Sequence, residues 1–138
     1  MVCHVRQGVI FQALDKKAVF IFNRTKKPIG FPGFFNAFED VWMHEGVRTP
    51  MVDYCGALGH ISPTDMGIKA AREALKRADV PAMDIGSVLT GNMAPGDFDQ
   101  FFLPRHIGLY AGVPVEVPAL MAQRICGTGF ELFRQAGE

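Results

Sequence analysis

The sequence predicts an α/β fold in which strands and helices alternate in the order β-α-β-α-β-α around a mostly parallel sheet. Three observations support this prediction. Short apolar runs suited to strands occur at 41–47, 85–90 and 117–121. Segments with helical spacing, 62–78 and about 104–111, separate these runs, and a third helical pattern follows the last run. Strands that alternate with helices are joined by crossovers, which favours parallel pairing and a sheet flanked by helices.

The first predicted helix has the clearest boundaries. Ser62 can cap it, Pro63 suits the first helical position, and Asp65 completes a pattern similar to a capping box. Small and apolar residues recur on one face, which predicts close packing against the sheet. These residues are Gly67, Ala71, Ala74, Leu75 and Ala78. Val80-Pro81 ends this helix, and Gly112 to Pro114 ends the second.

Length and composition are those of a globular domain. The chain has 138 residues, of which 49% are hydrophobic and 20% charged, enough to bury a core. No apolar stretch approaches the roughly 20 residues of a membrane-spanning helix. The three cysteines form no C-x-x-C pair, which argues against a disulfide framework or a zinc site and favours a reduced compartment. We therefore expect a cytoplasmic protein without a bound metal.

Residues 1–38 differ in character from residues 39–138. The first segment has six basic and one acidic side chain, a net charge of +5, and contains seven of the twelve phenylalanines. The remaining hundred residues have a net charge of −5. We interpret 1–38 as an atypical extension, translated from a misplaced start codon, and 39–138 as the α/β domain. A mitochondrial presequence and an arm that touches nucleic acid are the alternatives for 1–38.

Cys126 is the candidate nucleophile. The apolar run 117–121 is followed by this cysteine, a turn of small residues and a helical pattern. The first backbone N–H groups of a helix are unpaired and its dipole is positive there, so a thiolate is favoured. Functional sites of parallel sheets gather at the carboxyl ends of the strands, where Cys126 is predicted to lie.

Several motifs of the domain 39–138 follow one another in the order that a known family has them. They are Glu45 to Pro50 with its Arg-Thr-Pro ending, Asp65 to Ala71, Gly91-Asn92, Ala111 to Pro114 with Val117 to Ala119, and Arg124 to Gly129 around Cys126. With these motifs the domain resembles the N-terminal part of a thiolase, and the acetyl-CoA acetyltransferase subgroup is the nearest likeness. One departure is Phe101 to Leu103, where the family has a Gln-Asn-Pro type of sequence.

The resemblance implies a mechanism in which Cys126 takes an acyl group from an acyl-CoA as a thioester and passes it to a second acyl-CoA, or runs thiolysis in reverse. It implies coenzyme A thioesters as substrates, no separate cofactor, no nucleic acid, and homo-oligomeric full-length relatives. The activating His and second Cys of the family belong to its later half and have no counterpart here. We therefore expect an incomplete half-domain that is inactive alone, in the sense that it shows no catalytic turnover. The alternatives are a non-catalytic protein that binds lipid or acyl-CoA and a non-functional interaction fragment.

Other reactive side chains receive no catalytic role. Cys55 is interpreted as a passive loop thiol, and Cys3 with His4 falls short of the four ligands of structural zinc. Three further histidines lie outside the family's Gly-His-Pro context. They are His44, His60 and His106.

Overall fold

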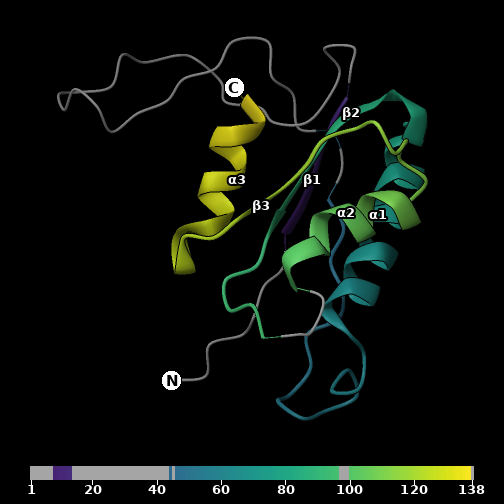
Figure 1. Cartoon of the computed structure of the whole chain (residues 1–138). Helices are drawn as coiled ribbons and strands as arrows, with labels where there is room; N and C mark the ends of the chain where they lie inside the picture. The colour runs from purple at the N-terminus through teal and green to yellow at the C-terminus, as the bar shows by residue number, and fades with distance from the viewer. Residues whose placement is uncertain (1–7, 14–43, 45, 97–99, 138) are drawn as a thin grey trace, which may run out of the picture.

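The computed structural model describes residues 8–13, 44, 46–96 and 100–137 (Figure 1). Strands and helices alternate along this part of the chain, which confirms the predicted α/β class and the order β-α-β-α-β-α. The elements are β1 (Gly8–Ala13), α1 (Pro63–Ala78), β2 (Ile85–Gly91), α2 (Leu103–Tyr110), β3 (Ala119–Ala122) and α3 (Thr128–Gly137). Three short 3₁₀ turns complete them: η1 (Ala82–Asp84), η2 (Gln100–Phe102) and η3 (Ile125–Gly127).

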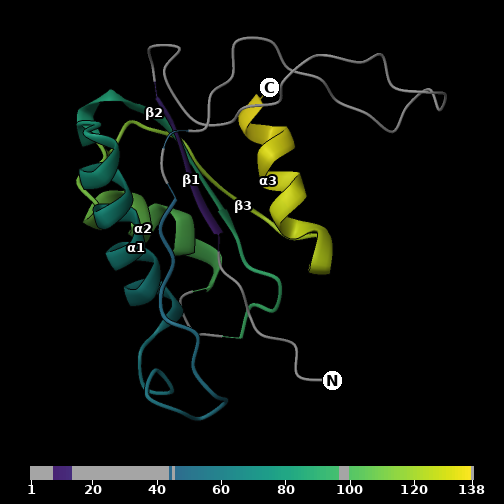
Figure 2. The same cartoon turned by 180° about the vertical axis from the view of Figure 1, so that it is seen from behind.

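The described strands form a three-stranded sheet in the order β1-β2-β3. β2 and β3 pair in parallel, from Val88 opposite Ala119 to Gly91 opposite Ala122. β1 pairs antiparallel with the other edge of β2. Two views show α1 and α2 on one face of this sheet and α3 on the other (Figures 1 and 2). The carboxyl ends of β2 and β3 therefore meet at one end of the sheet, in register.

The position of the first strand differs from the prediction. The described residues of the run 41–47, His44, Gly46 and Val47, form no strand, and 41–43 and 45 lie outside the described residues. The edge of β2 is instead covered by 8–13, from the segment interpreted as an extension. An uncovered edge leaves backbone N–H and C=O groups unpaired, and pairing with β1 satisfies them. Gly46 weakens the run 41–47 as a strand because glycine loses much backbone entropy and has no side chain to pack.

Helix α1 begins as the sequence predicted. The Ser62 hydroxyl accepts a hydrogen bond from the backbone N–H of Asp65 at 3.0 Å and donates one to the Asp65 carboxylate at 2.9 Å. Gly67, Ala71 and Leu75 are buried, which confirms the predicted face. The helix ends at Asp79, whose φ of 53° is left-handed and stops further helical bonding.

Replacing Ser62 with alanine is expected to destabilise the domain by about 1 kcal/mol, because the backbone N–H of Asp65 loses its capping acceptor. Urea unfolding followed by circular dichroism measures this difference. Ser62→Asp, which keeps an acceptor at the cap, is the matched control and should unfold close to wild type. Equal destabilisation by both substitutions would contradict this assignment of the cap.

Two apolar clusters hold the helices against the sheet. The larger lies between β2, α1 and α2, and its largest buried side chains include Ile85, Val88 and Ile107. The smaller lies on the other face and joins Leu89 and Ala122 to Leu132 and Ala136 of α3. Successive residues of a strand point to opposite faces, so β2 serves both clusters. The smaller cluster fixes α3, and with it the segment that contains Cys126.

Within the described residues, no helix combines the length and the apolar character needed to cross a membrane.

Candidate active site

Cys126 lies between β3 and α3. β3 ends at Ala122, the turn η3 contains Cys126, and α3 begins two residues after it, at Thr128. The cysteine is exposed and its thiol is free. Within the described part of the chain, no group hydrogen-bonds to this thiol. The structure therefore places Cys126 at the carboxyl end of β3, as predicted, with a sulfur open to solvent.

The turn before Cys126 has an unusual backbone. Ile125 has a φ of 45°, in the left-handed region that β-branched residues rarely adopt. Such a conformation costs on the order of 1–3 kcal/mol and persists only where the surrounding structure holds it. A hydrogen bond of 2.9 Å from the Gly127 N–H to the Arg124 carbonyl closes the turn. The nucleophile candidate thus follows directly after a strained residue.

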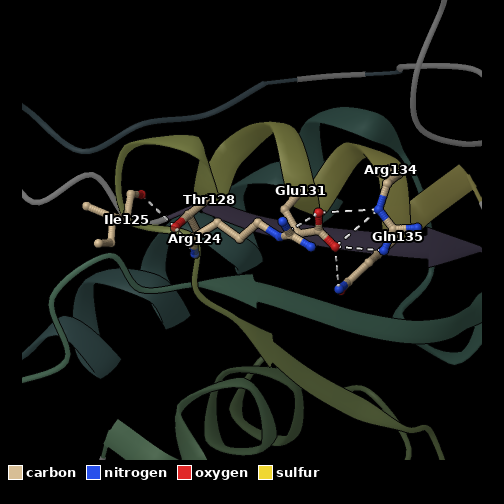
Figure 3. A network of polar contacts seen from close by, with 6 residues as sticks. All are labelled: Arg124, Ile125, Thr128, Glu131, Arg134 and Gln135. Atoms are coloured by element: carbon tan, nitrogen blue, oxygen red, sulfur yellow. Dashed lines mark hydrogen bonds and ion pairs between the residues drawn. The ribbon is translucent and has the colours of Figure 1, made fainter. Parts of the chain in front are cut away.

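Thr128 supplies two further contacts to this turn (Figure 3). Its hydroxyl accepts a hydrogen bond from the backbone N–H of Arg124 at 2.8 Å and donates one to the carbonyl of Ile125 at 2.7 Å. The side chain is buried, with 6% of its surface exposed. One hydroxyl therefore satisfies a backbone donor and a backbone acceptor that precede Cys126.

Glu131, one turn further along α3, is the centre of an ionic cluster (Figure 3). Its carboxylate pairs with Arg124 at 3.1 Å and with Arg134 at 2.7 Å, and it accepts a hydrogen bond from Gln135 at 3.0 Å. The Glu131 side chain is only 9% exposed. Hydrogen bonding from Arg134 holds the pKa of Glu131 below its ordinary value of 4.5, with Gln135 and Arg124 acting in the same direction against burial.

This lowered pKa predicts a pH dependence of stability. A carboxylate whose pKa is lower when folded stabilises the protein above its unfolded pKa, and this contribution is lost as pH falls through the folded value. The contribution of Glu131 is thus expected to be complete above pH 4.5 and to disappear below it. Urea unfolding of wild type and Glu131→Gln from pH 7 downward measures it, and the two curves should converge under acid. A stability difference that is constant with pH would contradict this prediction.

Gly91, the last residue of β2, lets α3 approach the sheet. A Cβ atom at this position would lie 2.5 Å from Cγ2 of Thr128 and 2.9 Å from Cδ1 of Leu132. The next residue, Asn92, is 2% exposed, and its backbone N–H donates to the Ala122 carbonyl at 3.4 Å. Gly91 therefore packs against the start of α3, and Asn92 is bonded to the end of β3, on either side of the turn that contains Cys126.

The remaining reactive side chains of the described residues belong to other parts of the fold. Cys55 is an exposed loop residue with a φ of 58°. His106 lies on α2 between the rings of Phe102 and Tyr110, with centroids 6.3 and 6.5 Å away. Among the described residues, no three His, Cys, Asp or Glu side chains are grouped so as to hold a metal. Cys3 and His4 lie outside the described residues.

The sequence motifs included Thr128 and Gly91 but gave them no role, and sequence reasoning did not identify Glu131. Thr128 carried a weak signal, since threonine next to a helix start is a common cap. Arg124 and Glu131 are seven residues apart, two helical turns, but the intervening 3₁₀ turn hides that relation in the sequence.

Comparison with known protein families shows to which family this chain belongs. The family model described as the N-terminal domain of thiolase matches residues 41–136, which contain α1, β2, α2, β3, Cys126 and all but the last residue of α3. The chain belongs to the thiolase family. The predicted resemblance is thereby confirmed.

Relatives of this thiolase-family chain include proteins named 3-ketoacyl-CoA thiolase and proteins named acetyl-CoA acetyltransferase. It is 43% identical to the mitochondrial 3-ketoacyl-CoA thiolase of Bos taurus over 84 residues, which are 61% of this chain and 21% of that protein. It is 34% identical to an acetyl-CoA acetyltransferase of Clostridioides difficile over 96 residues, which are 70% of this chain and 89% of that sequence. The matched region thus spans about a fifth of the length of the mitochondrial relatives.

Solved structures agree with this relationship. Human mitochondrial 3-ketoacyl-CoA thiolase in complex with CoA superposes with a TM-score of 0.60 at 36% identity, covering 64% of this chain and 23% of that one. Acetyl-CoA acetyltransferase from Syntrophomonas wolfei gives a TM-score of 0.62 at 30% identity, covering 67% and 23%. The thiolase-like fold class is therefore confirmed for the part of the fold that this chain covers.

Proposed function

We propose that the protein is a thiolase-type acyltransferase in which Cys126 accepts an acyl group from an acyl-CoA. The observation that carries this proposal is an exposed, free cysteine on an anchored, strained turn at the carboxyl end of β3. The names of the relatives, 3-ketoacyl-CoA thiolase and acetyl-CoA acetyltransferase, favour CoA thioesters as substrates. The chemistry needs no separate cofactor in this proposal, because the thioester itself is activated.

The first step exchanges one thioester for another. The Cys126 thiol gives its proton to solvent, its sulfur attacks the carbonyl carbon of the acyl-CoA, and a tetrahedral oxyanion forms. The oxyanion collapses as the bond to the CoA sulfur breaks, and the CoA thiolate takes up a proton. The backbone N–H of Cys126 is suited to donate to the oxyanion, where charge develops. Nothing is oxidised or reduced, and the acyl group moves from one sulfur to another.

The second step forms a carbon–carbon bond. A second acyl-CoA gives up a proton from its α carbon to a base, a role that the resemblance assigns to the later half of the family's fold, and the resulting carbanion attacks the carbonyl carbon of the Cys126 thioester. The bond to the Cys126 sulfur breaks, the thiolate is regenerated, and a 3-oxoacyl-CoA leaves. Thiolysis is the same sequence in reverse. Covalent catalysis of this kind divides one difficult condensation into two easier steps.

Release of CoA from acetyl-CoA tests the proposal. A rapid-mixing experiment with the 138-residue chain should show a burst that approaches one equivalent of CoA for each chain, because each chain contains one Cys126. Free CoA is separated and quantified by chromatography so that the thiols of the protein do not contribute. CoA release no faster than spontaneous hydrolysis would overturn the proposal and favour a non-catalytic role.

Cellular location and assembly belong to the same proposal. We retain the cytoplasmic location expected from the sequence, while the relatives from Bos taurus and Homo sapiens bear names that specify mitochondria. Imaging of the chain with a carboxyl-terminal fluorescent tag distinguishes the two compartments. Self-association, expected from the resemblance, is tested by sedimentation velocity over a range of protein concentrations.

A further inference from the structure

The turn that contains Cys126 is a short loop closed at its base by one side chain. The Thr128 hydroxyl joins Arg124 N–H and Ile125 C=O, so residues 124–128 form a ring of contacts with Cys126 at its centre. The Cys126 thiol has no hydrogen-bond partner among the described residues, so the backbone alone sets its position. Any change in this ring therefore changes where the sulfur lies.

Glu131 holds the same turn from a second direction. Its carboxylate contacts the Arg124 Nε at 3.1 Å, while Arg134 and Gln135 from the next turn of α3 fix the carboxylate itself (Figure 3). Arg134 and Gln135 fix the Glu131 carboxylate independently of Arg124. The ion pair with this fixed carboxylate therefore tethers the Arg124 side chain to α3. Thr128 holds the Arg124 backbone, and Glu131 holds its side chain.

These two anchors hold a strained conformation in place. Ile125, between Arg124 and Cys126, has a φ of 45°. Relaxation of this residue toward a negative φ would change the direction in which the Cys126 side chain points. Thr128 cannot rotate freely to follow such a change, because its methyl group fills the space above Gly91. Thr128 and Glu131 thus maintain the conformation of Ile125 and, through it, set the orientation of the Cys126 thiol.

We propose that Thr128 and Glu131 are positioning residues that orient Cys126 for attack on the acyl-CoA carbonyl, an inference that rests on the proposed function. Thr128 acts through the backbone of Arg124 and Ile125, and Glu131 acts through the side chain of Arg124. A purely structural role of Glu131, as the partner of Arg134 within α3, would stabilise the helix without affecting the rate of acyl transfer.

Four variants separate positioning from stability. Thr128→Val keeps the shape and removes the hydroxyl, whereas Thr128→Ser keeps the hydroxyl. Glu131→Gln removes the charge that tethers Arg124. Glu73→Gln is its control, because Glu73 forms an ion pair with Arg77 at 2.8 Å on α1, a more exposed pair outside the turn.

The readouts are the maximum rate of CoA release, the acetyl-CoA concentration that gives half of it, and amide hydrogen exchange of residues 123–129. Thr128→Val should lower the maximum rate by about tenfold to a hundredfold, since small misplacements of reacting groups have effects of this size. The half-saturating concentration should stay unchanged, and Thr128→Ser should restore most of the rate. Glu131→Gln should slow the reaction less than Thr128→Val, and Glu73→Gln should match wild type.

The outcomes distinguish failure of this inference from failure of the proposed function. Suppose that wild type releases CoA, that Thr128→Val has the same maximum rate as Thr128→Ser, and that Glu131→Gln has the same maximum rate as Glu73→Gln. The positioning role is then overturned, and the proposed function stands. Should wild type release none, the proposed function fails, and positioning for acyl transfer fails with it. Where wild type does release CoA, a slower rate together with faster exchange of 123–129 in Thr128→Val and Glu131→Gln than in their controls supports positioning, and equal rates overturn it. If Thr128→Val does not fold, the maximum rates of CoA release by Glu131→Gln and Glu73→Gln decide the question. A slower rate in Glu131→Gln supports positioning, and equal rates overturn it.

Discussion

Replacing Cys126 with alanine is expected to abolish the burst of CoA from acetyl-CoA. The sulfur is the atom that forms the new thioester in the proposed mechanism, and alanine has no nucleophile to replace it. Because the side chain is exposed and its thiol is free, the substitution should leave the thermal unfolding midpoint close to that of wild type. Rapid mixing with acetyl-CoA, together with a thermal melt of the same preparation, measures both quantities.

Cys55→Ala is the matched control for this experiment. Cys55 is also exposed and also free, but it lies in the loop before α1 and not in the turn between β3 and α3. Its replacement should leave the burst at the wild-type amplitude. A burst that survives in Cys126→Ala, or that is lost in Cys55→Ala, would assign the acyl group to a different thiol.

Replacing Gly91 with alanine is expected to destabilise the domain by about 1–3 kcal/mol, the usual effect of overpacking a filled core. The new methyl group would lie 2.5 Å from Thr128 Cγ2, and Thr128 is held by its bonds to Arg124 and Ile125. Thr128 must therefore move, which disturbs the turn as well as the packing of Leu132. We expect the variant to show both a lower free energy of unfolding and slower CoA release.

Gly129→Ala provides the comparison for Gly91→Ala. A Cβ atom on Gly129 meets nothing within 4 Å, although this residue lies in α3 close to Cys126. Alanine in a helix is favoured over glycine by up to about 1 kcal/mol, so this variant should be as stable as wild type or slightly more stable. Urea unfolding of the two variants beside wild type gives both differences. A stable Gly91→Ala variant would contradict the close contact between β2 and Thr128.

Local signals in the sequence predicted the elements that depend on local chemistry. Ser62, Pro63 and Asp65 act within one turn of helix, so their pattern marked the start of α1 correctly. The apolar run 85–90 is long enough and well enough bounded to be recognised as β2. The break between β3 and α3 at Cys126 was visible because small residues and a helical pattern follow the strand.

Contacts between distant segments were not predictable in this way. The pairing of 8–13 with β2 depends on a free sheet edge, which only the folded arrangement creates. The role of Gly91 depends on the approach of Thr128, 37 positions later in the sequence. Glu131 resembled an ordinary surface charge on a helix until folding brought Arg124 and Arg134 to its two oxygens. The catalytic role of Cys126 and the division of the chain at residue 38 stay predictions.

Peptide mass spectrometry after incubation with acetyl-CoA tests the central claim most directly. The chain is quenched in acid, digested, and searched for an acetyl thioester on each of its three cysteines, with sensitivity to hydroxylamine as the sign of a thioester. We predict that the acetyl group is found on Cys126 and that Cys3 and Cys55 remain unmodified. Equal acetylation of the three cysteines, or none on Cys126, would contradict its role as the acyl acceptor.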